Sequence, residues 1–210
     1  MSSQPSLPIV AEPMSLADVP TVAAIEKAVF TSPWSPHAFI YDLSRRQDSY
    51  YLVARYLPWE SRPDRPADST VVDRSIMGYV GAWFVIDELH IATIAVRPEW
   101  RRRGVGELLF QHMLRWAIHR GAVCATLEVR RTNLTAQGLY LKYGFEFVGC
   151  RRRYYSDNGE DALLMTAEDI ASPAYLALLD EHLAELSARL TQTLTPPPVL
   201  EPLAPIMVQD

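Results

Sequence analysis

The sequence predicts one domain of the α/β class, in which helices pack on a central sheet. Strand-like, β-branched segments alternate with segments whose apolar residues recur at helical spacing, from Ile9 to Met165. The 210 residues, of which 49% are hydrophobic, suffice for one domain of ordinary size with tails, so no disulfide or metal is needed to stabilise it. A third observation is a basic, glycine-containing turn that leads from a strand into a helix, which indicates where a ligand could bind.

The first part of the chain predicts strands and helices separated by short turns. The expected elements are a disordered start at 1–8, a strand at 8–13, a helix from Ser15 to about Phe30, a short helix from Ser35, a strand at 49–56 and a Pro-rich loop at 57–75. Ser15 and Ser35 are good N-caps, and Pro36 suits the first position of a helix. The prolines and charges of 57–75 suggest an exposed loop inserted into the domain rather than a domain boundary.

The second part of the chain continues the alternation and adds a helix. The expected elements are strands at 76–87 and 88–96, a helix from about 104 to Gly121, a strand at 123–130, a helix at 133–144, strands at 145–155 and 160–167, and a helix from Ser172. In the last helix, leucines follow a three-four spacing at Leu176, Leu179, Leu183, Leu186 and Leu190. This leucine seam fits packing on its own domain or docking on a partner. Residues beyond Thr195 are expected to be disordered or a flexible arm.

Composition argues against several classes of protein. A formal net charge of −5 disfavours a dedicated nucleic-acid binder, which would need to neutralise phosphates. No apolar run approaches the roughly 20 residues that span a bilayer, and the first residues lack the features of a secretory signal, so a soluble cytoplasmic protein is expected. Cys124 and Cys150 lie in apolar segments and are expected to be buried, and no Cys or His spacing indicates a metal site.

The basic turn is the strongest local indication of a ligand. A helix N-terminus presents unpaired backbone N–H groups and the positive end of the helix dipole. Gly104 and Gly106 remove side chains that would keep a phosphate from these groups, and Arg101 to Arg103 supply guanidinium donors. A bound pyrophosphate would explain all these features, whereas the plainer alternative is a glycine turn with a solvated basic cap. Neither G-x-x-x-x-G-K-[ST] nor G-x-G-x-x-G is present.

The same stretch, "AVRPEWRRRGVGELLF", resembles the acetyl-coenzyme A motif [QR]-x-x-G-x-[GA] of the GNAT N-acetyltransferase superfamily. The segments "TLEVRRTNLTAQGLYLKYGFEFVGCRRRYYSDNGEDALLM" and "SPWSPHAF" resemble the bacterial ribosomal-protein-alanine N-acetyltransferase branch of that superfamily. The resemblance spans about Ile9 to Met165. It implies the GNAT fold, a mixed, mostly antiparallel sheet flanked by helices and splayed between its fourth and fifth strands. Residues after Ile170 lie outside the resemblance and are expected to be dispensable for turnover.

The resemblance implies acetyl-coenzyme A as co-substrate, without a metal. The pantetheine arm would bond to the main chain of Ile94, Ala95 and Val96 in the gap between the splayed strands. The expected contacts of the pyrophosphate come from Arg101, Arg102, Arg103, Gly104, Val105, Gly106 and Glu107. Asn133 would lie beside the coenzyme arm, and it also fits the N-cap of the helix that follows, which is compatible with the first role.

Two residues are candidates for proton transfer. Acetyl transfer to an amine requires that the attacking ammonium loses a proton and that the departing thiolate gains one. Glu128 is a carboxylate in the otherwise apolar strand "CATLEVR", and its position in the resemblance implies a general base. Tyr140 is placed near the sulfur, where a phenol could protonate the thiolate. The alternatives are an outward-facing or ion-paired Glu128 and a core Tyr140.

The expected function follows from these matches. Trp34, Tyr154 and Tyr155 resemble residues that line the peptide entrance in related enzymes, although packing would also explain them. The protein is expected to acetylate the N-terminal alanine of a small-subunit ribosomal protein by direct attack in a ternary complex, because no cysteine is placed as a nucleophile. The alternatives are a GNAT enzyme that acts on lysine or a small amine, and a GNAT-fold binding module without catalysis.

Overall fold

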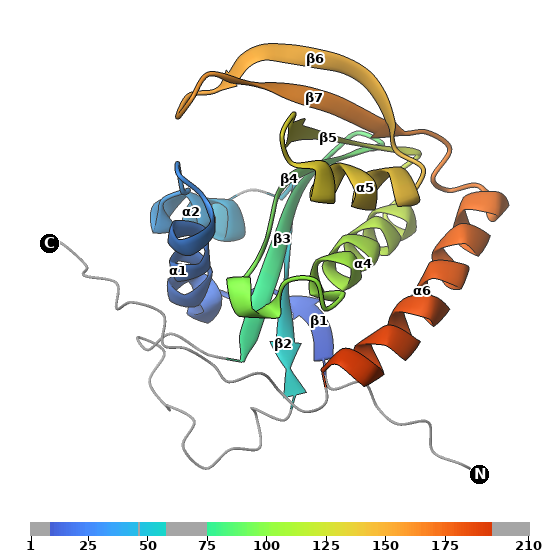
Figure 1. Cartoon of the computed structure of the whole chain (residues 1–210), viewed down its shortest axis with the longest axis horizontal. Coiled ribbons are helices and arrows are strands. Elements are labelled where there is room, and N and C mark those ends of the chain that lie inside the picture. Colours follow the sequence, from blue (N-terminus) through green and yellow to red (C-terminus); the bar gives the residue numbers. More distant parts are fainter. Residues whose placement is uncertain (1–8, 46, 58–74, 195–210) are drawn as a thin grey trace, which may run out of the picture.

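The described residues of this computed structural model, 9–45, 47–57 and 75–194, form a domain built on a seven-stranded sheet with the order β1-β2-β3-β4-β5-β7-β6 (Figure 1). The strands are β1 (Ile9–Pro13), β2 (Ser49–Tyr56), β3 (Ile76–Val85), β4 (Glu88–Val96), β5 (Cys124–Arg130), β6 (Glu146–Tyr155) and β7 (Glu160–Ala167). β4 and β5 pair in parallel, and the other neighbours pair antiparallel. The predictions for 1–8, for most of 57–75 and for 195–210 lie outside the described residues.

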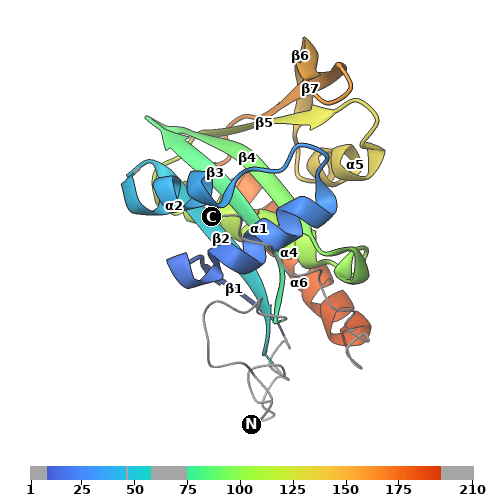
Figure 2. The same ribbon diagram turned by 90° about the vertical axis from the view of Figure 1, so that its left-hand side faces the viewer.

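Helices cover both faces of the sheet. They are α1 (Val19–Val29), α2 (Pro36–Arg45), α4 (Val105–His119), α5 (Leu134–Lys142) and α6 (Pro173–Thr193). Figures 1 and 2 show α1 and α2 on one face and α4 on the other, with α6 running beside α4. None of the described helices combines the length and the apolarity needed to cross a bilayer. The predicted α/β class and the helix-flanked sheet are confirmed.

The two faces of the sheet have separate cores because side chains alternate along each strand. On β2, Leu52 and Ala54 belong to the larger apolar cluster, which also contains buried residues of α4 and α6. Tyr51 and Val53 point the other way, into the smaller cluster that includes Val22, Ile25 and Phe39 of α1 and α2. A strand that is apolar on both faces is buried on both sides, which fits the place of β2 between β1 and β3, with helices on both faces of the sheet.

The first helix differs from its prediction at its start. A separate 3-10 turn, Leu16–Asp18, precedes α1, and the Val19 amide bonds to the Leu16 carbonyl. Ser15 begins this turn through a capping box with Asp18. Pro20 explains the break, because it has no N–H to donate to the carbonyl four residues earlier. The predicted helix from Ser15 to Phe30 therefore lies where it was expected. It is not one continuous helix, because the 3-10 turn is separate from α1.

The parallel pair in the middle of the sheet opens toward one end. The register of β4 with β5 runs from Glu88 opposite Cys124 to Ile91 opposite Leu127 and stops there. β4 continues to Val96 along β3, while β5 continues to Arg130 along β7. The strands therefore separate beyond Ile91, and the predicted splay between the fourth and fifth strands is confirmed. This gap positions the site.

The C-terminal helix packs on its own domain. Leu179, Leu186 and Leu190 are buried in the larger apolar cluster. The described structure therefore shows the leucine seam packed on its own domain, which is one of the two predicted alternatives. The expectation for the cysteines is wrong in part, because Cys124 is half-buried and Cys150 is exposed. Cys150 lies on β6, the edge strand, whose side chains are almost all exposed.

Candidate active site

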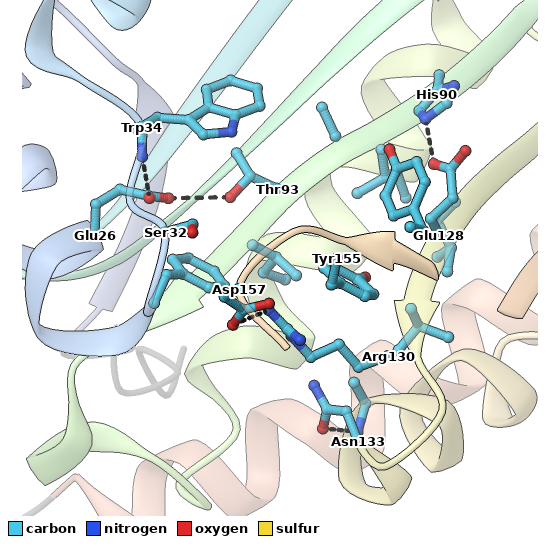
Figure 3. Close-up of a pocket in the computed structure, with 18 of the residues that line it drawn as sticks. Glu26, Ser32, Trp34, His90, Thr93, Glu128, Arg130, Asn133, Tyr155 and Asp157 are labelled. Atoms are coloured by element: carbon cyan, nitrogen blue, oxygen red, sulfur yellow. Dashed lines mark hydrogen bonds and ion pairs between the residues drawn. The ribbon is translucent and has the colours of Figure 1, made fainter. Parts of the chain in front are cut away.

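A pocket of about 370 Å³ lies where β4 and β5 separate (Figure 3). Its walls come from the α1–α2 loop, β4, β5, the start of α5 and the end of β6. The sequence-predicted residues that line it are Trp34, Ile94, Glu128, Asn133, Tyr140, Tyr154 and Tyr155. The structure thus brings together both proton-transfer candidates and all three entrance candidates. Ala95, Val96 and residues 101–107 do not line this pocket.

Glu128 extends from β5 toward the pocket, where two side chains hold it. His90 Nε2 of β4 lies 2.8 Å from one carboxylate oxygen, and an Arg151 guanidinium nitrogen lies 3.0 Å from the other. The hydrogen bond from His90 lowers the pKa of Glu128; burial works in the opposite direction, and the charges of His90 and Arg151 add to the lowering. Glu128 is therefore an anion at neutral pH. As a carboxylate only accepts hydrogen bonds, His90 Nε2 is the donor.

Tyr140 has the opposite electrostatic setting. It lies on α5 and is buried. Its ring centroid lies 5.1 Å from that of Phe110 and 6.1 Å from that of Phe145. Burial is the main cause that raises the pKa of its phenol above the ordinary value, so it stays protonated at neutral pH. The pocket thus combines a charged proton acceptor with a neutral proton donor, which is the pairing that acyl transfer to an amine requires.

Aromatic rings surround the mouth of the pocket. The Trp34 ring stacks on that of Trp83, with centroids 6.1 Å apart and an interplanar angle of 13°. Tyr154 and Tyr155 meet edge to face at 5.2 Å, and the Arg130 guanidinium lies 3.8 Å from the centre of the Tyr155 ring. These contacts fix the rings as walls. Trp34, Tyr154 and Tyr155 therefore both pack against neighbouring side chains and line the pocket.

A polar bridge joins the two sides of the mouth. The Thr31 hydroxyl in the α1–α2 loop donates to Asp157 in the β6–β7 turn. Asp157 also pairs with Arg130 at 2.8 Å (Figure 3). Arg130 in turn pairs with Glu160 of β7 at 3.1 Å. Segments that lie more than a hundred residues apart in the chain are thus tied together. The contact between the α1–α2 loop and the β6–β7 turn therefore limits the pocket on this side.

Glu26 is a second carboxyl group in the pocket, and the sequence analysis did not identify it. It belongs to α1, is buried, and accepts hydrogen bonds from the Trp34 amide at 2.9 Å and the Thr93 hydroxyl at 3.3 Å. The Tyr79 hydroxyl contacts the same oxygen as Thr93. Burial raises the pKa of Glu26 to about 7, against the lowering effect of the hydrogen bonds from Trp34 and Thr93. Glu26 therefore carries a proton in much of the protein at neutral pH.

The glycine turn (residues 101–106) leads into α4 at the far end of β4. Arg102 and Gly104 both have left-handed backbone, with φ of 58° and 91°. The Val105 and Glu107 side chains are buried, so only their amides can face a ligand. A Cβ on Gly106 would meet Val96 Cγ2 at 3.4 Å, an ordinary contact, so packing alone does not require glycine there. A left-handed turn before an unpaired helix start is a geometry that binds anions.

Two of the three arginines of this turn have partners inside the protein. Arg101 Nε donates to the Val96 carbonyl at 3.2 Å, and Arg103 donates to the Thr193 carbonyl of α6 at 3.1 Å. Asn133 caps α5, because its side-chain oxygen accepts from the Ala136 amide at 3.2 Å, and it also lines the pocket. The N-cap alternative for Asn133 is therefore confirmed, and its role beside a coenzyme stays a prediction.

Sequence signals for the missed residues were weak. The signal at Glu26 is its place among the apolar residues of its helix, four residues after Val22 and three before Val29, whereas His90 in "ELHIATIAV" reads as an ordinary outward residue of a strand. Only the pairing of β4 with β5 in the structure places His90 beside Glu128. Within the described residues, no group of three or more His, Cys, Asp or Glu side chains could hold a metal ion.

Comparisons with known proteins agree with this geometry. The sequence model of the family described as "Acetyltransferase (GNAT) family" matches residues 20–145. A putative [ribosomal protein bS18]-alanine N-acetyltransferase of Bacillus subtilis is 38% identical over 152 residues, which cover 72% of this chain and 90% of that protein. The [ribosomal protein bS18]-alanine N-acetyltransferase of Salmonella typhimurium is 32% identical over 154 residues, which cover 72% and 92%.

Solved structures show the same fold. The crystal structure of the ribosomal-protein-S18-alanine N-acetyltransferase from Escherichia coli matches with a TM-score of 0.62 at 25% identity, covering 77% of this chain and 94% of that one. Arabidopsis thaliana NAA60 in complex with acetyl-CoA matches with a TM-score of 0.63 at 19% identity, covering 76% and 98%, and supports the fold. The family match and these relatives show that the chain is an N-acetyltransferase and belongs to the GNAT acetyltransferase family, and the splayed sheet agrees with them.

Proposed function

We propose that this protein transfers the acetyl group of acetyl-coenzyme A to the N-terminal α-amine of a protein, namely the N-terminal alanine of a small-subunit ribosomal protein, in the cytoplasm. The observation that carries the proposal is that an ionised Glu128 and a protonated Tyr140 both line the pocket between the splayed strands. The identity of the acceptor is supported by the bS18-alanine N-acetyltransferases that resemble this chain.

The coenzyme would enter along the gap between β4 and β5. Beyond Ile91 none of the described strands pairs with the β5 side of β4, so main-chain groups of Ile94 to Val96 are candidates to bond the pantetheine arm. The amides of Val105, Gly106 and Glu107 at the start of α4, with the exposed Arg102, would bind the pyrophosphate. This route leads the thioester toward the pocket that contains Tyr140.

The chemistry needs no covalent enzyme intermediate. A peptide α-ammonium has a pKa of roughly 7.7–8.0, so Glu128, directly or through a water, accepts its proton and leaves a neutral amine. The amine nitrogen attacks the thioester carbonyl carbon and becomes positively charged, so it then releases its second proton to solvent. Collapse of the resulting tetrahedral intermediate breaks the carbon–sulfur bond and leaves the neutral amide, and Glu128 returns its own proton to solvent. Tyr140 donates its proton to the departing thiolate and regains one from solvent. His90 and Arg151 keep Glu128 ionised and oriented during these steps.

The acceptor would enter between the aromatic walls. Trp34 of the α1–α2 loop lies on one side and Tyr154 and Tyr155 on the other, and the bridge from Thr31 to Asp157 limits the opening. A chain terminus can enter such an opening with its backbone extended. A lysine ammonium, with a pKa near 10.4, is a weaker acid than an α-ammonium, so the same carboxylate deprotonates it less readily.

A peptide panel tests the proposal. Purified protein is incubated with acetyl-coenzyme A and matched peptides that begin with Ala, Ser, Met or Glu and contain one internal lysine, and the acetylated position is located by mass spectrometry. We expect acetylation of the free N-terminal alanine and none of the same peptide with a blocked N-terminus. Acetylation of the internal lysine in the blocked peptide, or only of small amines, would contradict the proposed acceptor.

A further inference from the structure

The C-terminal helix α6 is pressed against the glycine turn, although it lies outside the segment that matches the family. A Cβ on Gly104 would meet Leu186 Cδ1 at 2.8 Å and Leu190 Cδ2 at 3.1 Å. Figures 1 and 2 both show the C-terminal end of α6 beside the loop that enters α4. Two features therefore require glycine at position 104: its left-handed backbone conformation, and the closeness of α6, which leaves no room for a side chain.

Two hydrogen bonds fasten the glycine turn to the end of α6. Arg103 donates to the Thr193 carbonyl at 3.1 Å, and the Thr193 hydroxyl shares its one proton between the Arg103 carbonyl at 3.2 Å and the Arg189 carbonyl of its own helix at 3.0 Å. The first bond places a cation on the carbonyls at a helix C-terminus, where positive charge is favourable. The main chain of the turn and one of its side chains are thus both held from behind, by an element that does not face the pocket.

A charge cluster connects α6 with the first turn of α4. Glu107 is buried there, and its carboxylate accepts hydrogen bonds from Arg189 of α6, from Lys142 of α5 at 2.8 Å and from the Tyr143 hydroxyl at 3.2 Å. Burial alone would raise the pKa of Glu107, but the bonds and charges of Lys142 and Arg189 together lower it. Glu107 is therefore an anion within the helix start that would receive a pyrophosphate.

An unneutralised carboxylate at that place would oppose a polyanionic ligand. Charges within a few ångströms of each other interact strongly when they are partly shielded from water. Lys142 and Arg189 offset the charge of Glu107, and Arg189 is the one of the two that α6 supplies. The fit of the helix start to an anion thus depends on a residue more than eighty positions further along the chain.

We propose that α6 is a built-in support for coenzyme binding, in which Arg189 neutralises Glu107 and Thr193 holds the glycine turn in its anion-binding shape. Arg189 and Thr193 are positioning residues, since they act through Glu107 and Arg103. The proposal rests on the proposed function, because it takes coenzyme A as the ligand of the turn. It replaces the expectation that residues after Ile170 are dispensable for turnover.

The test measures coenzyme A affinity by calorimetry in the full-length protein. Arg189→Met keeps the length of the side chain and removes its charge, and we expect about tenfold weaker binding, within the usual range of coupling between neighbouring sites. The acetyl-coenzyme A KM should rise in parallel, with kcat and the peptide KM little changed. Arg189→Lys should restore most of the affinity. Arg115→Met is the matched control, because it breaks the 2.6 Å pair with Asp180 elsewhere on α6.

A double variant separates charge from packing. If Arg189 acts by neutralising Glu107, then Glu107→Gln in the Arg189→Met background should recover affinity that Arg189→Met loses. Thr193→Val, which keeps the shape of the side chain and removes its hydroxyl, should weaken coenzyme binding without a matching loss of thermal stability. Thr193→Val keeps the proposal testable if Arg189→Met folds poorly, because it leaves Arg189 in place.

Two results would overturn the proposal, and they differ in what they say about the proposed function. Coenzyme affinity that is the same in wild type, Arg189→Met and Thr193→Val would show that α6 serves stability alone, while acetyl transfer would stand. A folded wild-type protein that binds no coenzyme A would overturn the proposed function and this inference with it.

Discussion

Two walls of the same pocket each carry a carboxyl group, half-buried Glu128 and buried Glu26, and the two groups have different charge states at neutral pH. Glu128 on the β5 wall has its pKa lowered, because His90 and Arg151 compensate for burial. Glu26 on the α1 wall is surrounded by neutral donors, and burial raises its pKa to about 7. The difference shows that the partners of a carboxyl group decide its state, more than burial alone.

The charge states indicate different roles. An ionised carboxylate can attract an ammonium and accept its proton, so the β5 wall is suited to the chemistry. A half-protonated carboxyl group that bonds the Trp34 amide is suited to holding the α1–α2 loop, so the α1 wall is suited to the shape of the entrance. The following substitutions test this division, from the largest expected effect to the smallest.

Glu128→Gln should cause the largest loss. The amide keeps the shape and part of the hydrogen bonding but cannot accept a proton, a role worth roughly 10²–10⁴-fold in rate. Steady-state kcat/KM with an N-terminal alanine peptide at neutral pH measures the effect. Coenzyme A affinity serves as the control and should change little, because the proposed pyrophosphate contacts lie on a different segment.

Tyr140→Phe should cause a smaller loss that reaches the lower part of the same range, roughly 10²-fold, because the thiolate can still leave without a positioned donor. The ring packs against Phe110 and Phe145, so the Phe variant should fold normally. The measurement is kcat with a saturating peptide across the pH range. A kcat equal to that of wild type would show that Tyr140 is a core residue only.

Glu26→Gln should change kcat by about threefold or less, because glutamine can replace most of the hydrogen bonds of a protonated carboxyl group. It should also flatten the pH dependence of stability. In wild type, the contribution of protonated Glu26 is complete below its ordinary pKa of 4.5 and is lost as pH rises through about 7. Thermal melts at several pH values measure this. A loss of kcat as large as that of Glu128→Gln would indicate that Glu26, on the α1 wall, acts as the general base.

His90→Gln should have a still smaller effect at neutral pH than Glu26→Gln, because Glu128 remains ionised there. Its hydrogen bond is the main cause that lowers the pKa of Glu128, so removing it should shift the acidic limb of the kcat/KM profile to higher pH. A profile with an unchanged acidic limb would show that His90 does not set the charge state of Glu128.

The fold followed from the sequence where apolar runs are bounded by turn residues. The strands at 49–56, 88–96 and 160–167 agree with their predictions residue for residue. The start of the first helix did not, because a proline in the first turn removed one donor. The leucine seam predicted a helix, but only the structure shows that its apolar side meets α4 and the glycine turn, since periodicity names no partner.

The site could be predicted only where a residue carries its own signal. Glu128 is an acidic residue in an apolar strand, and the glycines and arginines at 101–106 are unusual at a helix start. Glu26 carries a similar signal, because it lies at helical spacing from Val22 and Val29. His90 and Arg189 have no such signal, because each acquires its role from a side chain distant in the sequence. Exposed charged residues of helices and strands look alike until the fold brings their partners together.

The measurement that tests the central claim most directly is kcat/KM against pH for wild type, Glu128→Gln and Glu26→Gln with the same N-terminal alanine peptide. The account predicts that raising the pH partly rescues Glu128→Gln, because solution then supplies neutral amine, and that Glu26→Gln follows wild type. Near wild-type activity of Glu128→Gln at neutral pH would contradict the account, because the carboxylate on the β5 wall would then be structural.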